Sequence, residues 1–235
     1  MKFNTVFLEE TGSTNEEARK LAIEGYPQGT LVIADSQRGG RGRRGRNWYT
    51  PKGTSIAMSL ILKPELEAEH ASMLTLVQAM AVVKAIEETC GLKTQIKWPN
   101  DILVNEKKVC GILTEMNLEG RKISSIIIGT GINVNQEHFP EDISKIATSL
   151  KRESGKIQSR EKLTECVCGL FDKYYEMFLK TKDLSGILEE YNSYLVSRGR
   201  TVKVLDPKGE FQGEALGINA RGELCVRKDD GEELL

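Results

Sequence analysis

Short turns between strand-like segments in the middle of the chain constrain its fold most strongly. Residues 101–105, 109–117 and 123–135 are rich in apolar and β-branched residues, and only the turns at 105–108 and 118–122 separate them. Because parallel neighbours need a crossover of a dozen residues or more, these three strands are predicted to pair antiparallel. Further strand-like segments are at 4–9, 30–36, 54–62 and 94–99.

Apolar residues at helical spacing indicate two long helices beside these strands. The first spans residues 70–90, where apolar side chains recur three or four positions apart until Gly91. The second spans residues 159–180, and its aromatic side chains are interpreted as core. Shorter helices are predicted at 13–24 and 183–196. The chain is therefore predicted to be an α+β protein with a mixed, largely antiparallel sheet backed by helices.

The pattern changes after Gly199. Short strands are separated there by Pro-Lys-Gly, Ala-Arg-Gly and Asp-Asp-Gly turns. This spacing predicts a small β-barrel, so we divide the chain into a larger domain at 1–196 and a smaller one at 197–235. At least one further barrel strand would be expected beyond the last residues of the sequence.

Composition argues against several classes of function. The net charge is −1 at pH 7, so no overall basic field would hold a nucleic acid. No apolar run approaches the roughly 18–20 residues that span a bilayer, and the N-terminus lacks the apolar core of a signal peptide. Five scattered cysteines without a C-x-x-C pair predict reduced thiols in a cytoplasmic protein rather than a zinc site. Cys110 lies in an apolar run, as expected of a small buried residue.

Residues 36–53 concentrate positive charge in a glycine-containing segment. Four arginines lie between positions 41 and 46, and Trp48 and Tyr49 follow directly. Glycine lets a backbone approach a ligand closely, and arginine offers a planar fork of donors for phosphate or carboxylate. With an aromatic ring to stack on a base, the segment is interpreted as a flexible loop that closes on an anionic nucleotide. A solvated basic loop or a nucleic-acid patch is the alternative.

Two positions near the central hairpin carry candidate charges. Asp101 follows the Trp-Pro-Asn turn, where it either caps the turn or binds Mg²⁺ together with phosphate oxygens. Lys108 begins the next strand. It either points into solvent or enters a pocket as a mobile positive charge beside an oxygen under attack.

Small and polar residues form two further candidate segments. Gly129 and Gly131 lack the third glycine and the following helix of a dinucleotide fingerprint, so they predict a strand end flat enough for a ligand to lie against. The segment Gly-Ser-Thr-Asn at 12–15 either caps a helix or binds a small polar ligand at its N-terminus. Asn133 and Asn135 offer amides at the strand edge or form a turn.

Five segments occur together in one order: GSTN, SQRGGRGRRGRNWYTPKG, KWPNDI, KKVCGIL and GTGINVN. This set resembles the biotin–protein ligases, from residue 5 to about residue 228. The resemblance implies a class II synthetase-like catalytic domain followed by a small SH3-like barrel. It also implies an enzyme that activates biotin with ATP as biotinyl-5′-AMP. Such an enzyme then biotinylates a lysine in the biotin carboxyl carrier protein domain of a carboxylase.

The resemblance assigns roles to individual residues. The catalytic candidates are Lys108, Arg43 and Asp101, and Asp101 is also assigned to Mg²⁺. The residues assigned to biotin are Ser13, Thr14, Asn15, Gln37, Arg41, Gly42, Arg43, Lys108, Gly111, Gly129 and Gly131. The residues assigned to ATP are Arg43, Arg44, Arg46, Trp48, Asn100 and Asn133.

Alternative functions remain open at this point. A lipoate–protein ligase of the same superfamily is the main one, although the hydroxyl-rich GSTN segment suits a ureido ring better than a dithiolane ring. An RNA-binding module is less consistent with the near-zero net charge and with the lack of a strand of stacking aromatics. The catalytic segment starts within the first ten residues, so no DNA-binding domain and no sequence-specific DNA binding are expected. The resemblance also favours a homodimer that forms through the sheet.

Overall fold

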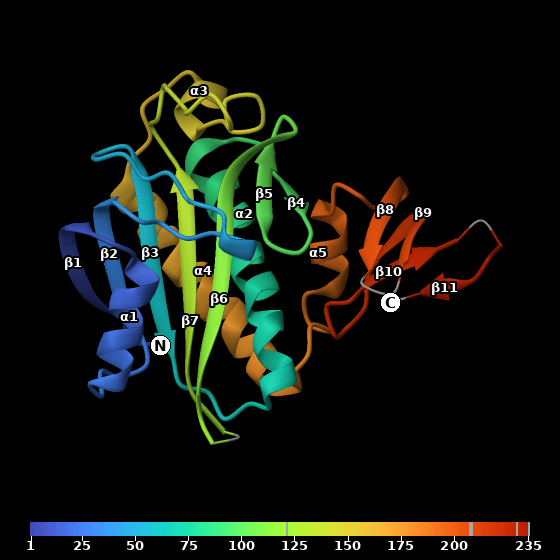
Figure 1. Ribbon diagram of the computed structural model, residues 1–235, viewed down its shortest axis with the longest axis horizontal. Helices are drawn as coiled ribbons and strands as arrows, with labels where there is room; N and C mark the ends of the chain where they lie inside the picture. Colours follow the sequence, from blue (N-terminus) through green and yellow to red (C-terminus); the bar gives the residue numbers. More distant parts are fainter. Residues whose placement is uncertain (121, 207–208, 229, 235) are drawn as a thin grey trace.

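A seven-stranded mixed sheet runs through the centre of the protein, as a computed structural model shows for residues 1–120, 122–206, 209–228 and 230–234 (Figure 1). Its strands are β1 (Asn4–Thr11), β2 (Thr30–Gln37), β3 (Ser55–Leu62), β4 (Gln95–Lys97), β5 (Asp101–Val104), β6 (Lys107–Glu119) and β7 (Lys122–Asn133). The spatial order is β1-β2-β3-β7-β6-β5-β4. β1 pairs parallel with β2, because a helical crossover joins them, and the other neighbours pair antiparallel.

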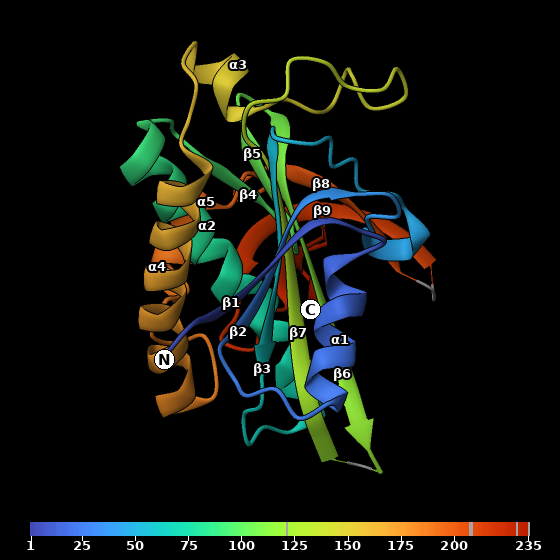
Figure 2. The same cartoon turned by 90° about the vertical axis from the view of Figure 1, so that its left-hand side faces the viewer.

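Helices cover the two faces of this sheet unequally. α2 (Leu74–Cys90) and α4 (Arg160–Thr181) pack together on one face, whereas α1 (Thr14–Ile23) lies against the other (Figure 2). The predicted end of α2 is confirmed, because Gly91 adopts the left-handed conformation with φ 67°. The shorter helical segments are η1 (Arg43–Gly45), η2 (Ala68–Met73), α3 (Leu150–Ser154) and α5 (Leu188–Tyr194).

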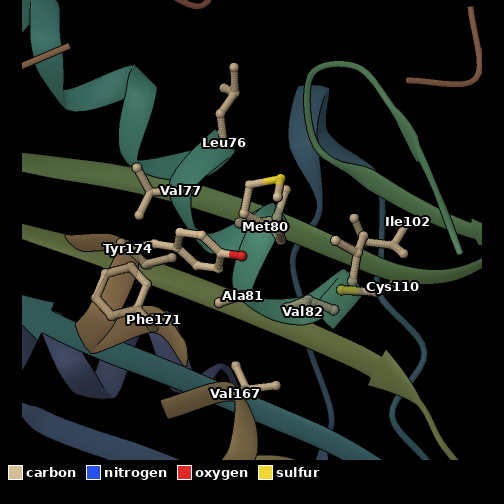
Figure 3. Packing of buried hydrophobic residues seen from close by; sticks show 14 of the residues in the cluster. Leu76, Val77, Met80, Ala81, Val82, Ile102, Cys110, Val167, Phe171 and Tyr174 are labelled. Atoms are coloured by element: carbon tan, nitrogen blue, oxygen red, sulfur yellow. The ribbon is translucent and has the colours of Figure 1, made fainter. Parts of the chain in front are cut away.

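The main core lies between the sheet and the pair formed by α2 and α4. Met80 of α2 and Phe171 of α4 are among its largest fully buried side chains (Figure 3). Cys110 of β6 is fully buried beside them, as predicted, and this burial raises the pKa of its thiol. Each fully buried apolar side chain of this core stabilises the fold by about 1.5–3 kcal/mol, because folding removes its surface from water. This layer therefore holds β6 and β7 rigidly from one side and leaves their other side free for a site.

A second, smaller sheet follows α5 and lies beside that helix (Figure 1). Its strands are β8 (Thr201–Asp206), β9 (Gly209–Ile218), β10 (Leu224–Arg227) and β11 (Glu233–Leu234), in the antiparallel order β11-β10-β9-β8. The buried amide of Asn192 joins it to α5, since it donates to the carbonyl of Ile218 at 3.2 Å and accepts from the N–H of Ile218 at 2.8 Å. The indole N–H of Trp98 donates to the carbonyl of Gly222 at 3.0 Å.

The predicted fold class is confirmed, because a mixed sheet backed by helices precedes a small antiparallel sheet. The Ala-Arg-Gly turn lies between β9 and β10, as predicted, whereas the Pro and Lys of the first turn and one Asp of the third lie outside the described residues. The division at 196/197 falls between α5 and β8 and stays a prediction. α3 carries no signal that the sequence analysis recognised. In the part of the chain that is described, no helix is long and apolar enough to cross a membrane.

We expect Asn192→Ala to lower the free energy of unfolding by about 1–3 kcal/mol, because it leaves the buried N–H and carbonyl of Ile218 without partners. Thermal or urea unfolding measures the change. Ser193→Ala is the control, since that exposed neighbour should stay within about 0.5 kcal/mol of the wild type. Equal effects of the two substitutions would contradict the assigned role of Asn192.

Candidate active site

A cavity opens between the start of α1, the central strands and the arginine loop, which we define as residues 38–48. The residues that line the cavity are Ser13, Thr14, Asn15, Gln37, Arg41, Gly42, Arg43, Trp48, Ala57, Asn100, Lys108, Gly111, Ile112, Leu113, Gly129, Thr130 and Gly131. Most of the residues assigned from the sequence are thus brought together from five separate segments of the chain.

Glycines form the floor of the cavity. Gly111 of β6 and Gly131 of β7 are directly paired, and a Cβ atom on Gly131 would lie 2.3 Å from the indole ring of Trp48. A Cβ atom on Gly129 would lie 2.1 Å from Oδ1 of Asn15. Real Cβ atoms do not tolerate such distances, so only glycine lets these side chains lie against the sheet. The floor is a flat strand surface of the kind that the sequence predicted.

Hydroxyl and amide groups form one wall, which we call the polar wall (Thr14, Asn15 and Gln37), and Ser59 is buried behind it. The N–H of Thr14 donates to Oε1 of Gln37 at 2.8 Å, and Nε2 of Gln37 donates to the hydroxyl of Thr50 at 2.9 Å. Nδ2 of Asn15 is bound elsewhere, by the carboxylate of Glu115 at 2.8 Å. The polar wall is therefore held in one arrangement by bonds to its own neighbours. Ser13, which precedes it as the N-cap of α1, makes no side-chain capping bond.

An ion pair lies at the edge of the cavity between β5 and β6. Nζ of Lys108 is 2.6 Å from Oδ1 of Asp101 and 5.4 Å from the centre of the Trp48 ring. Both charged side chains are about one-quarter exposed, so solvent screens their attraction only in part. The backbone of Lys108 is also fixed, since it donates to the carbonyl of Ile146 at 2.8 Å and accepts from Thr148 at 3.0 Å. The geometry presents one ammonium group, paired with Asp101, at a rigid strand position.

The arginine loop is folded by its own backbone bonds. The N–H of Gly42 donates to the carbonyl of Arg46 at 2.7 Å, and that of Trp48 donates to Gly40 at 2.8 Å. The guanidinium of Arg43 donates to Oδ1 of Asn100 at 3.1 Å, and Arg41 forms an ion pair with Glu16. Two guanidinium groups thus border the cavity and are held by partners outside the loop.

Four of the assigned residues do not line the cavity: Asp101, Arg44, Arg46 and Asn133. Asp101 is nonetheless connected to the cavity through Lys108. Arg44 and Arg46 are exposed, and Arg44 has a left-handed backbone with φ 56°. The side chain of Asn133 is buried, where it donates to the carbonyl of Thr148 at 3.0 Å and accepts from Gln136. In this structure Asn133 fastens the segment that holds Lys108 rather than facing the cavity.

Two residues around the site escaped the sequence analysis. Ser59 is fully buried on β3 opposite Gly129, and Glu115 lies on β6 next to Asn15. A polar residue in the otherwise apolar run of β3 was the available signal for Ser59. For Glu115 it was strand alternation, which places Glu115 on the same side of β6 as Gly111.

Within the described ranges, no group of three or more His, Cys, Asp or Glu side chains could enclose a metal ion. Asp101 offers one carboxylate beside the cavity, which fits Mg²⁺ when phosphate oxygens and water supply the other ligands.

Comparison with known proteins assigns this site to a family. The family model described as "Biotin/lipoate A/B protein ligase family" matches residues 7–133, which is more than half of the chain and includes every residue that lines the cavity. The chain belongs to the biotin/lipoate A/B protein ligase family. A second model, "Biotin protein ligase C terminal domain", matches residues 198–234 and so covers the small sheet. The resemblance recognised in the sequence motifs is therefore confirmed.

Individual ligases of this family extend the match over nearly the whole chain. The bifunctional ligase/repressor BirA of Bacillus subtilis is 42% identical over 93% of this chain and 68% of its own length. The biotin–[acetyl-CoA-carboxylase] ligase of Paracoccus denitrificans is 32% identical over 97% of this chain and 96% of its own. The structure of the Aquifex aeolicus biotin protein ligase in complex with biotin and ATP superposes with a TM-score of 0.85 at 33% identity, covering 99% of this chain and 95% of that one.

We expect Gly131→Ala to displace the indole of Trp48, because the added methyl group would occupy the position of the ring. The emission maximum of Trp48, read in a Trp98→Phe background, should shift to longer wavelength as the ring becomes more exposed. Gly169→Ala is the matched control: its Cβ meets no neighbouring atom in α4, so its emission should match that of the background protein. An unchanged spectrum for Gly131→Ala would contradict the contact.

Proposed function

We propose that this protein is a biotin–protein ligase, which forms biotinyl-5′-AMP from biotin and ATP and transfers the biotinyl group to a lysine of a biotin carboxyl carrier protein domain. The observation that carries the proposal is the polar wall above a glycine floor, beside a loop that brings two arginines to the same cavity. Two similarities support it: the Paracoccus relative named for acetyl-CoA carboxylase, and the Aquifex structure with biotin and ATP.

The polar wall favours biotin over lipoate as the substrate. A ureido ring presents two N–H donors and one carbonyl acceptor, whereas a dithiolane ring presents no N–H group. Thr14, Asn15 and Gln37 offer hydroxyl and amide groups, which would lack partners against a dithiolane. This chemical match distinguishes the two substrates of the family.

The arginines support the first step, in which two anions must meet. A carboxylate oxygen of biotin attacks the α-phosphorus of ATP, an O–P bond forms, and the bond to pyrophosphate breaks with its electron pair on the leaving group. Arg41 and Arg43 border the cavity and would neutralise the charge that develops on the phosphoryl oxygens. The arginine loop also covers a mixed anhydride that water would hydrolyse.

Lys108 supports the second step. The neutral amine of the carrier lysine attacks the biotinyl carbonyl carbon, a C–N bond forms, and AMP leaves with the electrons of the C–O bond while the amine loses a proton to solvent. The ammonium of Lys108 would stabilise the carbonyl oxygen, and Asp101 holds that ammonium at the edge of the cavity. No covalent bond to the enzyme is required, which agrees with the lack of an assigned nucleophile.

Three finer assignments accompany the proposal. Asp101 would hold Mg²⁺ beside the phosphates, where the ion would reduce their negative charge. A homodimer and a cytoplasmic location stay predictions from the sequence. Size-exclusion chromatography with light scattering tests the first of these two, and cell fractionation tests the second.

The direct test is ATP–pyrophosphate exchange with the purified protein. We expect exchange that depends on biotin and is absent with lipoate, followed by transfer of biotin to a carrier domain. Exchange supported by lipoate alone would replace biotin by lipoate as the substrate. Exchange with neither acid would refute ligase activity.

Arg43→Ala is expected to slow adenylate formation by about 10²–10³-fold and to speed the escape of adenylate into solution, because both the charge and the cover are lost. Rapid quench separates the two rates. Arg38→Ala is the control, since Arg38 pairs with Glu10 outside the cavity. Normal formation with a change in biotin release alone would contradict the role of Arg43.

Lys108→Ala is expected to reduce the rate of chemistry by about 10²-fold or more while the Kd for biotin changes less than tenfold. Stopped-flow binding and single-turnover transfer measure these two quantities. Lys107→Ala, the exposed neighbour on β6, is the matched control. Equal losses in binding and chemistry would reduce Lys108 to a binding residue.

A further inference from the structure

We propose that Glu115 is a positioning residue that sets the hydrogen-bond polarity of the polar wall, so that the wall presents acceptors to a ring with two N–H groups. The inference deepens the proposed function and rests on it. Glu115 is not among the residues that line the cavity, and it reaches a ligand through the side chain of Asn15.

Glu115 fixes the orientation of the Asn15 amide. Nδ2 of Asn15 lies 2.8 Å from Oε2 of Glu115 and 3.4 Å from the carbonyl oxygen of Leu113. A carboxylate and a carbonyl only accept hydrogen bonds, so the –NH₂ end of the amide must face them. The guanidinium of Arg19 binds the other carboxylate oxygen at 3.2 Å and so leaves Oε2 for Asn15. The oxygen of the Asn15 amide is thereby turned toward Ser59 and Gly129.

Ser59 couples the hydrogen-bond direction at Asn15 to that at Thr14. The Ser59 hydroxyl lies 2.6 Å from Oδ1 of Asn15 and 2.8 Å from the hydroxyl of Thr14. It carries one hydrogen, and Oδ1 can only accept, so that hydrogen goes to Asn15. The contact with Thr14 then needs the hydrogen of the Thr14 hydroxyl, whose other acceptor within reach is Oε1 of Gln37 at 3.2 Å. Because Ser59 is fully buried, solvent offers it no other partner.

The result is a cavity wall of acceptors. The only hydroxyl hydrogen of Thr14 goes to Ser59 at 2.8 Å or to Oε1 of Gln37 at 3.2 Å, so none is left for a ligand. Oε1 of Gln37 also accepts from the N–H of Thr14 at 2.8 Å. Oγ1 of Thr14 and Oδ1 of Asn15 therefore keep lone pairs and have no hydrogen to offer. Two such acceptors suit the two N–H donors of a cyclic urea. Without Glu115 the amide can turn, and donors would then face donors.

The main test compares Glu115→Ala with the wild type in the exchange assay. We expect the KM for biotin to rise about tenfold, which corresponds to the loss of about one hydrogen bond to the ligand. The KM for ATP and kcat should stay within about twofold. Glu115→Gln should recover most of the loss, because its Oε1 still accepts from Asn15. Glu119→Ala, an exposed glutamate at the end of β6, is the matched control and should leave all three constants unchanged.

Ser59→Ala is a second variant, which cuts the path between Asn15 and Thr14 even if Glu115→Ala fails to fold. Biotin methylated on one ring nitrogen is the probe, since it lacks one N–H donor. We expect the ratio of its KM to that of biotin to fall about tenfold or more in Ser59→Ala and in Glu115→Ala. An unchanged ratio in the folded variants, or equal rises in the KM values for biotin and ATP, would overturn the inference.

The wild-type result distinguishes failure of the proposed function from failure of the role assigned to Glu115. A wild-type protein without biotin-dependent exchange would refute the proposed function and the inference with it. A wild-type protein with exchange, whose Glu115→Ala variant behaves like Glu119→Ala, would refute the inference alone.

Discussion

The site depends on one constraint: side chains pack directly against the backbone of three glycines. Gly111 and Gly131 face each other on β6 and β7, and Gly129 continues the same face. Trp48 and Asn15 occupy the space where Cβ atoms would otherwise stand. The other side of these strands packs against α2 and α4, so the floor is supported by the main core. A flat, rigid surface thus brings a distant loop and a helix start to one place.

The cations of the site are held by partners rather than left free. Arg41 pairs with Glu16, Arg43 with the amide of Asn100, and Lys108 with Asp101. Each arrangement is partly exposed and is therefore weak enough to be exchanged for an anionic ligand. This explains how a protein with a net charge of −1 concentrates positive charge locally. The proposed reactants, which carry a carboxylate and phosphates, would bring these cations to bear on the same ligand.

Local patterns predicted most of the fold, and motif order predicted most of the cavity lining. Turn lengths fixed the antiparallel hairpins, and helical spacing located α2 and α4, because these features depend on neighbours in the chain. The orientation of Asn133 could not be predicted, since it depends on a segment that returns from residue 148. Glu115 was missed for the same reason: its partner Asn15 lies 100 positions away. Long-range hydrogen bonds leave no periodic trace in a sequence.

The backbone N–H and carbonyl of Lys108 are both bound by residues 146–148, which pair with β6 as an additional short strand would. The side chain of Asn133 binds the carbonyl of Thr148 in the same segment. Residues 133–148 therefore form a loop that the Asn133 side chain closes at Thr148. The length of this loop determines where its last residues meet the backbone of Lys108. A deletion within that loop would move the Lys108 ammonium group away from the cavity, although no residue that lines the cavity had changed.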